Sequence, residues 1–557
     1  MRISLARRRA GRDLLTGAMM LQQNKPVLIV GGGPVGLALG LELGMRGIQA
    51  VLIEQRDGKV LLPKMNTVSA RTMEFCRRWG VASKIKEAGI GEDHPLDVRF
   101  ITSMAGYELL RFTYPSYRER GKLDYTPEGN CVCSQLWFDP ILLERLCAFP
   151  NIKVRLLTRL DAFVQDDNGV HAEVTDLASG KKDKISGSYL VGCDGADSFV
   201  RELAGIKLLG NPRLNTNLNI FLKCRQFASL QNGRPAQMHR IVGPEGVWGN
   251  MHALDGRELW RMTVHLKQDA PDPNVEEIVK RVAGSDVDFE VVEVFRWDRR
   301  KMVAERYSSG RVFLVGDSAH QMSTTGGFGM NTGMSDAVDL AWKLEAALKG
   351  WGGASLLESY EAERKPIALR NLEESTETFL QSKAVVPGSE EFVKDSPEGD
   401  RLRTAFTKAL LDGDVRRQFE VEGVALGYRY DPSPIVCPDG TPPSADEICT
   451  YTQTARPGSR APHAWQADGG STLDLFGDGF VLLRFDKDPA AAGGLSRAAS
   501  ERNVPLRVLR LDSPQIAGLY EARLALVRPD GHVGWRSDAA PENPGAVIDR
   551  LRGAQVD

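Results

Sequence analysis

The sequence is poor in the patterns that mark several large protein classes. Its 557 residues include 8 cysteines, too few for a disulfide scaffold, and these form neither a CxxC pair nor a Cys/His spacing that suits zinc. No apolar run is long enough to cross a bilayer as a helix. The formal net charge of -2, with no basic stretch interleaved with aromatics, gives no indication of nucleic-acid binding. These absences predict a cytoplasmic protein that binds no metal, no nucleic acid and no membrane.

The length of the sequence predicts several domains, and its first 24 residues differ from the rest. A single hydrophobic core stops growing well below 557 residues, so we expect roughly two to four domains. Residues 1–24 contain several arginines, no acid before Asp13, and no apolar core of the kind a secretory signal needs. We expect a disordered tail, or a start codon placed upstream of Met19 or Met20. The composition also leaves an organelle presequence open.

A glycine-rich motif follows the first apolar run. Val27–Val30 is typical of a buried parallel strand, and a helix-like segment and a second apolar run come after it. In this βαβ unit Gly31 permits a tight turn, Gly33 lets the backbone approach a pyrophosphate, and Gly36 lets helix and strand pack closely. Glu54 ends the second strand, where it can accept hydrogen bonds from a ribose. The spacing predicts a dinucleotide site at the start of a helix, whose free N–H groups favour phosphate.

Two further strand ends carry polar residues. Asp194-Gly195-Ala196-Asp197-Ser198 follows an apolar strand, and its simpler interpretation is a turn in which Asp197 or Ser198 caps the next helix. Gly316-Asp317 ends another apolar strand, and its carboxylate can bind a ribityl hydroxyl. A glycine-rich loop and a helix from about Asn331 to Lys349 follow it, so backbone N–H groups at the helix start would stabilise an anionic isoalloxazine.

Taken together, the three motifs indicate FAD held in an extended form, and the chain resembles a known family. It is similar to the single-component, FAD-dependent aromatic hydroxylases, the class A flavoprotein monooxygenases, in the branch of the phenol and aromatic-polyketide hydroxylases. The resemblance covers nearly everything from Lys25 onward. It implies the following cofactor-binding residues: Gly31, Gly33, Pro34, Val35, Gly36, Glu54, Gln55, Lys64, Arg71, Gln135, Asp194, Gly195, Asp317, Gly329, Met330 and Asn331. It implies catalytic positions at Thr324, Gly326 and Gly327.

The resemblance also implies a fold class and a domain arrangement. We expect an α/β protein with a Rossmann-type FAD-binding domain, an inserted mixed-sheet substrate domain and a C-terminal thioredoxin-like domain. The expected ranges are 25–96, 126–210 and 301–390 for the FAD-binding domain, 97–125 and 211–300 for the substrate sheet, 391–431 for a helical linker, and 432–557 for the thioredoxin-like domain. Since that last domain lacks CxxC, a structural role is expected for it rather than thiol redox chemistry.

Two positions depart from the family pattern. Ser323-Thr324 stands where the family usually has Pro-Pro, which brings a hydroxyl and a freer backbone to the reaction zone. Lys64 stands where an arginine commonly contacts the cofactor, so the charge is kept but the fork geometry is lost. The particular substrate therefore cannot be carried over from the family.

The implied reaction is NAD(P)H- and O2-dependent hydroxylation of a phenolic or related aromatic substrate through a flavin C4a-hydroperoxide. NADPH or NADH is the expected cosubstrate, a small aromatic compound and O2 are the expected partners, and a homodimer is expected. Three alternatives stay open: a flavin halogenase, a flavin oxidoreductase that only passes hydride, and a non-catalytic flavin-bound binding protein. The sequence contains no Trp-x-Trp-x-Ile-Pro segment, and this absence counts against a flavin halogenase.

The substrate would lie under a sheet formed by residues 98–112 and by segments between 215 and 296. Within it, Val247–Met251 and Leu259–Met262 are candidates to line the substrate, and plain strand packing is the alternative for each residue. His320 follows Asp317 directly, and here a structural hydrogen bond is the interpretation that competes with a catalytic role.

Overall fold

The computed structural model describes residues 25–383, 385–488 and 490–554. The expectation for residues 1–24 lies outside the described residues. No helix in the described ranges combines the length and apolar character needed to span a bilayer.

A six-stranded sheet forms the centre of the FAD-binding domain. Its strand order is β17-β18-β11-β1-β2-β7, and all pairs are parallel except β17 with β18. The apolar runs of β1 and β2 are buried along their whole length, as a strand covered on both faces requires. The strands are β1 (Val27–Val30), β2 (Ala50–Ile53), β7 (Ile152–Arg155), β11 (Tyr189–Gly192), β17 (Ser308–Ser309) and β18 (Val312–Leu314). Helices α2 (Pro34–Met45) and α10 (Phe328–Lys349) pack against each other beside it.

An eight-stranded sheet forms the substrate domain. Its order is β19-β16-β12-β15-β14-β13-β4-β5. The strands are β4 (Val98–Ile101), β5 (Glu108–Phe112), β12 (Leu208–Lys223), β13 (Met238–Gly243), β14 (Gly246–Ala253), β15 (Leu259–Leu266), β16 (Glu290–Ala304) and β19 (His320–Gln321). One face is apolar and packs with α9 (Val275–Ala283), which buries Ile278, Val279 and Val282 against it. The sheet thus draws on strands within residues 98–112 and 208–304, and on β19.

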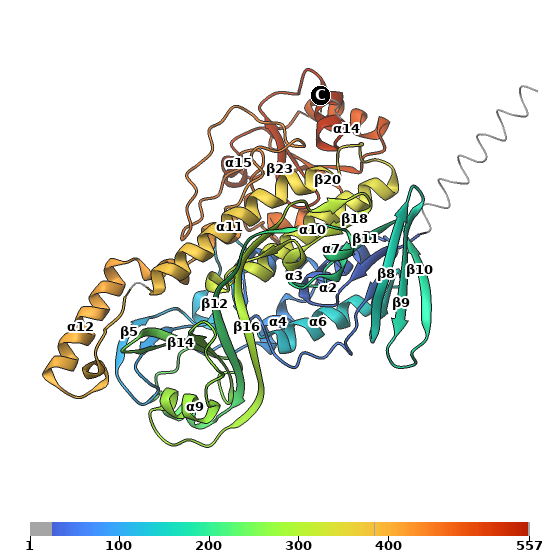
Figure 1. Cartoon of the computed structure of the whole chain (residues 1–557). Coiled ribbons are helices and arrows are strands. Elements are labelled where there is room, and N and C mark those ends of the chain that lie inside the picture. The colour runs from blue at the N-terminus through green and yellow to red at the C-terminus, as the bar shows by residue number, and fades with distance from the viewer. Residues whose placement is uncertain (1–24, 384, 489, 555–557) are drawn as a thin grey trace, which may run out of the picture.

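Two long strands connect the substrate sheet to the FAD-binding domain. β12 and β16 pair from Leu208 with Ala304 to Lys223 with Glu290, with a register shift between Asn211 and Asn215. Figure 1 shows them as one curved ribbon that runs from the central sheet down to α9. β16 also pairs with β19, which lies just after Gly316-Asp317. The loop of the third motif is thus tied directly to the substrate sheet.

The remaining elements of the first 430 residues surround these two sheets. A three-stranded antiparallel sheet consists of β8 (Thr158–Asp166), β9 (Gly169–Asp176) and β10 (Lys182–Gly187), and a small pair consists of β3 (Thr67–Val68) and β6 (Cys131–Val132). The other α-helices are α3 (Ala70–Arg78), α4 (Ala82–Ala88), α5 (Tyr117–Arg120), α6 (Gln135–Cys147), α7 (Phe199–Leu203), α8 (Gln226–Ser229), α11 (Ser359–Lys383), α12 (Pro397–Asp412) and α13 (Glu422–Leu426). Short 3-10 turns are η1 (Gly316–Ser318), η2 (Thr325–Gly327), η3 (Glu390–Val393) and η4 (Val415–Gln418).

The segment expected to be a helical linker also covers the substrate sheet. Phe392, Phe406 and Leu410 of this segment are buried in one cluster with Phe100 and Phe112 of β4 and β5. Residues 391–431 contain α12, η4 and α13, and they add core to the substrate domain.

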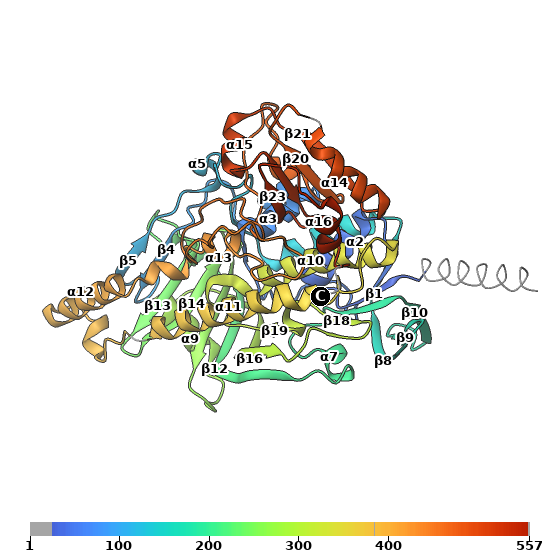
Figure 2. The same cartoon turned by 90° about the horizontal axis from the view of Figure 1, so that it is seen from above.

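The C-terminal domain has the strand order and connections of a thioredoxin-like fold. Its sheet is β21-β20-β22-β23, in which β20 pairs parallel with β21 and antiparallel with β22, and β22 pairs antiparallel with β23. The elements are η5 (Thr472–Leu475), β20 (Phe480–Arg484), α14 (Ala490–Glu501), β21 (Leu506–Arg510), α15 (Pro514–Tyr520), β22 (Leu524–Val527), β23 (Val533–Ser537) and α16 (Pro544–Leu551). Figures 1 and 2 both place this domain against α10. The predicted fold class is confirmed.

Candidate functional site

The glycines of the first motif divide into two that the fold requires and one that it does not. Gly31 has a φ of +107°, and a Cβ there would lie 2.4 Å from the carbonyl oxygen of Cys193. A Cβ on Gly36 would lie 2.0 Å from the carbonyl oxygen of Gly31. At Gly33 φ is -73° and no atom lies within 4 Å of a Cβ. The protein therefore leaves open the side of the loop at which a pyrophosphate is expected.

Glu54 lies beside this loop at the end of β2. Its Oε2 accepts a hydrogen bond from the backbone N–H of Gly32 at 2.6 Å, and its Oε1 accepts one from the N–H of Arg56 at 2.7 Å. Gln55, the next residue, is exposed. The carboxylate thus fixes the glycine loop and lies where the ribose contact was predicted.

Helices α2 and α10 begin without a capping side chain. Gly33 precedes α2, whose first residues are Pro34 and Val35, and Gly327 precedes α10; neither helix has an acidic residue in its first turn. The longer helices α3, α6, α9, α12 and α16, by contrast, each begin with a serine or asparagine side chain that accepts a first-turn N–H. Free N–H groups and a positive dipole end favour an anionic ligand at both places.

Asp317 lies next to the start of α10. Its side chain is exposed, yet the surrounding protein raises its pKa through burial, while the charges of His320 and Lys64 oppose that rise. A Cβ on Gly329 would lie 3.8 Å from Asp317 Oδ1. Lys64 is held from the other side, because its backbone N–H donates to Oε1 of Gln135 at 2.9 Å. The structure therefore brings Asp317, Lys64, Gln135 and Gly329 into one region.

Asn331 uses its side chain within the protein. Its Oδ1 accepts hydrogen bonds from Ser69 N at 2.9 Å and Thr72 Oγ1 at 2.7 Å, and its Nδ2 donates to the carbonyl of Gly327 at 2.7 Å. These bonds tie the first turn of α10 to α3. Only the backbone of Asn331, with that of its neighbour Met330, is left for a cofactor.

The loop with the Ser323-Thr324 departure is held by an arginine of β16. Nη1 of Arg299 donates to the hydroxyl of Ser323 at 2.7 Å, to that of Thr324 at 3.0 Å and to that of Thr325 at 3.3 Å. Thr324 itself is exposed, and the following Gly326 and Gly327 have φ of +80° and +70°. Ser323 and Thr324 therefore give a guanidinium from the substrate sheet two hydroxyl acceptors that a Pro-Pro pair would lack, in addition to Thr325.

The second motif forms the capped turn that its sequence favours. Ser198 Oγ accepts from the N–H of Arg201 at 3.0 Å, and Asp194 Oδ2 accepts from the N–H of Val200 at 2.9 Å. Burial raises the pKa of Asp194. Its carboxylate is thus occupied by the start of α7, and Gly195, with a φ of +84°, is the part of the motif with open space around it.

Arg71 lies between domains. It forms an ion pair with Glu74 at 2.8 Å and donates to the carbonyl oxygen of Asp530 at 2.8 Å, while only 5% of its surface is exposed. Its partners belong to α3, to the C-terminal domain and to the segment between the domains, where Tyr428 hydrogen-bonds to it. Sequence comparison with the family gave no signal for this docking role.

His320 has the structural hydrogen bond that competed with catalysis. Its Nε2 lies 2.7 Å from Oδ2 of Asp336, whose Oδ1 accepts from Nε of Arg364 at 2.7 Å, and all three side chains are buried. Burial would raise the pKa of Asp336, but Arg364 and His320 lower it below its ordinary value. Asp336 Oδ2 also accepts from the N–H of Gly316 at 3.3 Å, so this group supports the loop of the third motif.

The substrate sheet has a polar face that sequence reasoning did not identify. Trp248, Met251, Trp260 and Met262 belong to the apolar core with α9, which confirms strand packing for them. The alternate residues form the other face: Asn217, Asn219, Arg240, Asn250, His252, Arg261, Thr263, His265 and Arg299. Alternation of polar and apolar residues in β12 and β15, and from Asn250 to Ala253 in β14, was the available signal. This face meets the FAD-binding domain, since Arg261 donates to the carbonyl of Pro63 at 3.3 Å and Arg299 binds the loop at Thr324.

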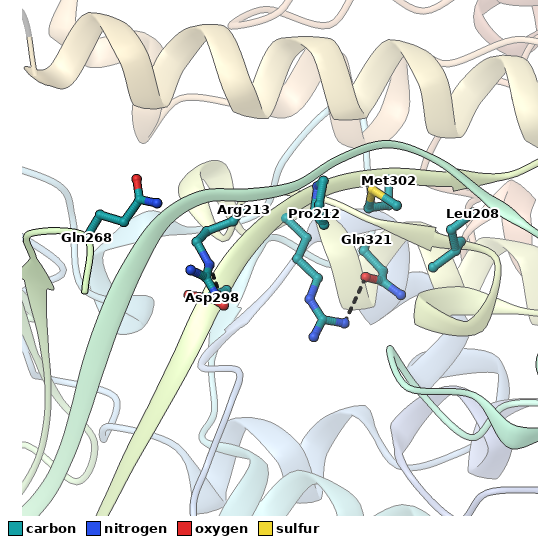
Figure 3. Close-up of a pocket in the computed structure, with 8 residues that line it drawn as sticks. Leu208, Pro212, Arg213, Gln268, Asp298, Met302 and Gln321 are labelled. Atoms are coloured by element: carbon teal, nitrogen blue, oxygen red, sulfur yellow. Dashed lines mark hydrogen bonds and ion pairs between the residues drawn. The ribbon is translucent and has the colours of Figure 1, made fainter.

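A separate cavity of about 540 Å³ lies by the β12–β16 ribbon. It is lined by Leu208, Pro212, Arg213, Gln268, Asp298, Arg300, Met302 and Gln321. Figure 3 shows Arg213 bonded to Asp298, an ion pair of 3.0 Å. Arg300 in turn pairs with Asp197 of the second motif at 2.8 Å. Both arginines that line this cavity are thus paired with an aspartate.

Comparisons with known proteins agree with this arrangement. Residues 24–375 match the family described as FAD binding domain, and residues 454–554 match aromatic-ring hydroxylase, C-terminal. A Streptomyces halstedii protein named as a polyketide hydroxylase is 34% identical over 548 residues, covering 92% of this chain and 93% of that one. Among solved structures, RebC with bound 7-carboxy-K252c has a TM-score of 0.90 and 40% identity, covering 95% of this chain and 99% of that chain. Aklavinone-11 hydroxylase with FAD and aklavinone has a TM-score of 0.80 and 27% identity, with the same coverage of 95% and 99%.

Proposed function

The chain belongs to the FAD-dependent aromatic-ring hydroxylases, and we propose that it uses NAD(P)H and O2 to hydroxylate a phenolic or related aromatic compound. The observation that carries this proposal is the contact between Arg299 of the substrate sheet and the hydroxyls of the loop at Thr324. That contact joins the polar face of the sheet to the loop that follows Asp317. A substrate on the polar face would therefore lie next to the flavin.

The residues around Asp317 and at the starts of α2 and α10 fit FAD. Gly33 and the uncapped start of α2 would hold the pyrophosphate, Glu54 the adenosine ribose, and Asp317 the ribityl chain. The uncapped start of α10 would face the pyrimidine edge of the ring, where negative charge develops on reduction. Bound FAD, reduced by a hydride donor, supplies the activated oxygen for the reaction.

The protein's own contribution is to position the substrate and to exclude water. Thr324 is exposed, and its hydroxyl oxygen accepts a hydrogen bond from Arg299. The hydroxyl hydrogen can therefore be donated in a fixed direction to the substrate or to oxygen. Gly326 and Gly327, both with positive φ, let the loop lie flat beside the ring system. We assign these three positions to the reaction zone.

The remaining parts of the proposal concern partners. NADH and NADPH are equal candidates as cosubstrate, because no second nucleotide fingerprint is present in the sequence. A homodimer is also part of the proposal. A cytoplasmic location remains a prediction. The relatives act on or bind different aromatic compounds, so they leave the substrate class open.

Isotope labelling tests the reaction. The holoenzyme is supplied with NADH or NADPH and a panel of phenols under heavy-isotope oxygen gas, and the products are analysed by mass spectrometry. We expect one labelled oxygen in the product for each NAD(P)H consumed in coupled turnover. Label that comes only from water, or NAD(P)H oxidation without any oxygenated product across the panel, would reject hydroxylation.

A further inference from the structure

Three arginines are buried on the polar face of the substrate sheet. Arg240 lies on β13, Arg261 on β15 and Arg299 on β16, and their exposed fractions are 7%, 9% and 3%. The strand register places them on one face, because Arg240 is opposite Asn250, Arg261 is opposite His252, and Asn250 and His252 alternate along β14. Arg299 is opposite Asn215, and the side chain of Asn217 joins it on the same face.

None of these arginines has an acidic partner. Within the described ranges twelve arginines are buried, and nine of them form an ion pair with an aspartate or glutamate. The three that do not are Arg240, Arg261 and Arg299. Among the described residues, every other buried guanidinium group thus has an acidic partner, and the three without one lie on this one surface.

The contacts that these arginines make are with neutral groups. Arg240 donates to Oε1 of Gln418 at 2.6 Å, and Arg261 donates to a backbone carbonyl. Nε of Arg240 and Nε of Arg261 have no hydrogen-bond partner among the described residues. Burial lowers the pKa of Arg240 and of Arg261 to about 10, and burial together with the charge of Arg240 lowers the pKa of Arg299 to about 9.

The other titratable groups nearby add no negative charge. The pKa of His252 and that of His265 are well below the ordinary value, because the rings are buried and face these arginines. Burial and Arg299 also lower the pKa of Lys383. An uncompensated buried charge is strongly unfavourable for folding, so three of them together indicate a surface prepared for a negatively charged ligand.

We propose that the substrate is an aromatic compound with at least two carboxylates, bound between Arg240, Arg261 and Arg299. The planar guanidinium fork matches a carboxylate in two parallel hydrogen bonds, which the unpartnered Nε groups can supply. The strands of Arg240 and Arg299 are four positions apart in the sheet, about 19 Å at ~4.8 Å per strand, but the charge of Arg240 acts on Arg299, so the two guanidinium groups lie closer together than their strands. A ring system that carries two carboxylates can therefore contact both. This inference rests on the proposed function, since it places the aromatic ring beside Thr324.

Binding to the oxidised holoenzyme, measured by perturbation of the flavin absorbance, tests the inference without NAD(P)H or turnover. The probes are isophthalate, naphthalene-2,6-dicarboxylate and biphenyl-4,4'-dicarboxylate, each compared with its own diamide and with unsubstituted phenol. We expect at least one dicarboxylate to bind ten-fold or more tightly than its diamide and than phenol. Equal binding of acid and amide, or binding of phenol alone, would overturn the proposal.

Matched variants locate the effect. Arg240→Met and Arg261→Met should each weaken dicarboxylate binding at least ten-fold and leave diamide binding unchanged. Arg296→Met is the control, because Arg296 lies on β16 with its side chain on the opposite face and paired with Asp272 at 2.7 Å. A loss of affinity that is equal for acid and amide would show that the arginines shape the sheet instead of binding charge.

Thermal stability gives an independent reading. With no ligand, Arg240→Met should melt at or above the wild-type Tm, because it removes an uncompensated charge. Arg364→Met should lower the Tm, because it strands Asp336. A drop for Arg240→Met as large as that for Arg364→Met would make Arg240 structural and overturn the proposal. If dicarboxylates bind through the arginines but no labelled product forms, the inference stands and the proposed hydroxylation is rejected. If a phenol gives labelled product but no dicarboxylate binds, hydroxylation stands and the inference is rejected.

Discussion

Arg528 joins the C-terminal domain to the FAD-binding domain through buried charges. From the end of β22 its guanidinium reaches Oε2 of Glu363 at 2.9 Å, Oδ1 of Asp339 at 3.1 Å and Oδ2 of Asp530 at 2.6 Å. Lys343 pairs with Asp339 at 2.8 Å and with Glu363 at 2.6 Å. These side chains are at most 2% exposed, so water cannot replace a lost partner.

Arg528→Met should destabilise this interface strongly. The substitution leaves three buried carboxylates with one lysine, and removing one partner of a buried ion pair typically costs about 3–5 kcal/mol. At ~1.4 kcal/mol per factor of ten, that is roughly a hundred-fold to several-thousand-fold in the equilibrium between docked and unfolded C-terminal domain. Methionine keeps most of the volume, so lost packing adds little to the loss.

The pH dependence of the loss has a definite sign. In the wild type, burial would raise the pKa of Glu363, but Arg528 and Lys343 lower it to about 2, so its charged form stabilises the fold above its ordinary pKa of 4.5. Burial already raises the pKa of Asp339 in the same cluster to about 7, although Lys343 and Arg528 lower it. Without Arg528 the pKa values of Glu363 and Asp339 both rise, so the variant loses stability as the pH rises through them. The difference between wild type and variant should therefore be larger at pH 8 than at pH 5.

Urea unfolding followed by tryptophan emission measures the effect. Trp342 is a local reporter, because its ring centroid lies 5.2 Å from the guanidinium carbon of Arg528. Arg510→Met is the control, since Arg510 pairs with the exposed Asp512 and should change stability by less than about 1 kcal/mol. In Arg528→Met with Glu363→Gln, part of the loss should be recovered. A variant within 1 kcal/mol of the wild type at pH 8, or a loss that shrinks as the pH rises, would refute the reasoning.

Three further predictions concern the flavin site and the thiols. Gly33→Leu should yield folded protein without FAD, because a Cβ there meets no protein atom and the side chain fills the open side of the loop, whereas Gly36→Leu should impair folding itself. Flavin absorbance per folded chain, with folding judged by circular dichroism, separates the two variants. Full flavin content in Gly33→Leu would contradict the assignment. Thr324→Val removes one of the three hydroxyl acceptors of Arg299, a bond of about 1 kcal/mol. It should divert NAD(P)H oxidation toward hydrogen peroxide at unchanged flavin content, and unaltered coupling would exclude a polar role. Cys437→Ser with Cys449→Ser should leave turnover unchanged, since burial raises both thiol pKa values, that of Cys437 to about 11, and a large rate loss would give the thiols a role.

The parts of the fold that could be predicted are those that a short stretch of sequence determines by itself. The apolar runs before Gly31 and Gly316 predict buried parallel strands, and Gly36 predicts close packing of helix on strand, because each pattern leaves the backbone little choice. The start of α10 lies three residues before the predicted Asn331, since Gly327 adopts a left-handed conformation that begins the helix at Phe328. Helix ends depend on such single dihedral angles, which a periodicity does not contain.

The parts that could not be predicted depend on partners far away in the sequence. Arg71 is adjacent to Glu74 in its helix, but its contact with Asp530 exists only because the C-terminal domain docks there. Arg261 was named as one residue of a possible lining segment, and nothing local distinguishes an arginine that will have an acid beside it from one that will not. Only the assembled sheet shows that Arg240 and Arg299 share its face without acids.

The uncapped starts of α2 and α10 have a consequence for how the chain behaves inside a cell. Two sets of helix N–H groups are left without a protein acceptor, so the flavin completes the fold as well as the chemistry. A ligand at a thousand times its Kd adds about 4 kcal/mol to stability, which is a large share of what a domain has. Riboflavin supply during expression should therefore set how much of the chain escapes proteolysis, and a variant with a damaged cofactor site will resemble a folding defect in any screen that counts only soluble yield.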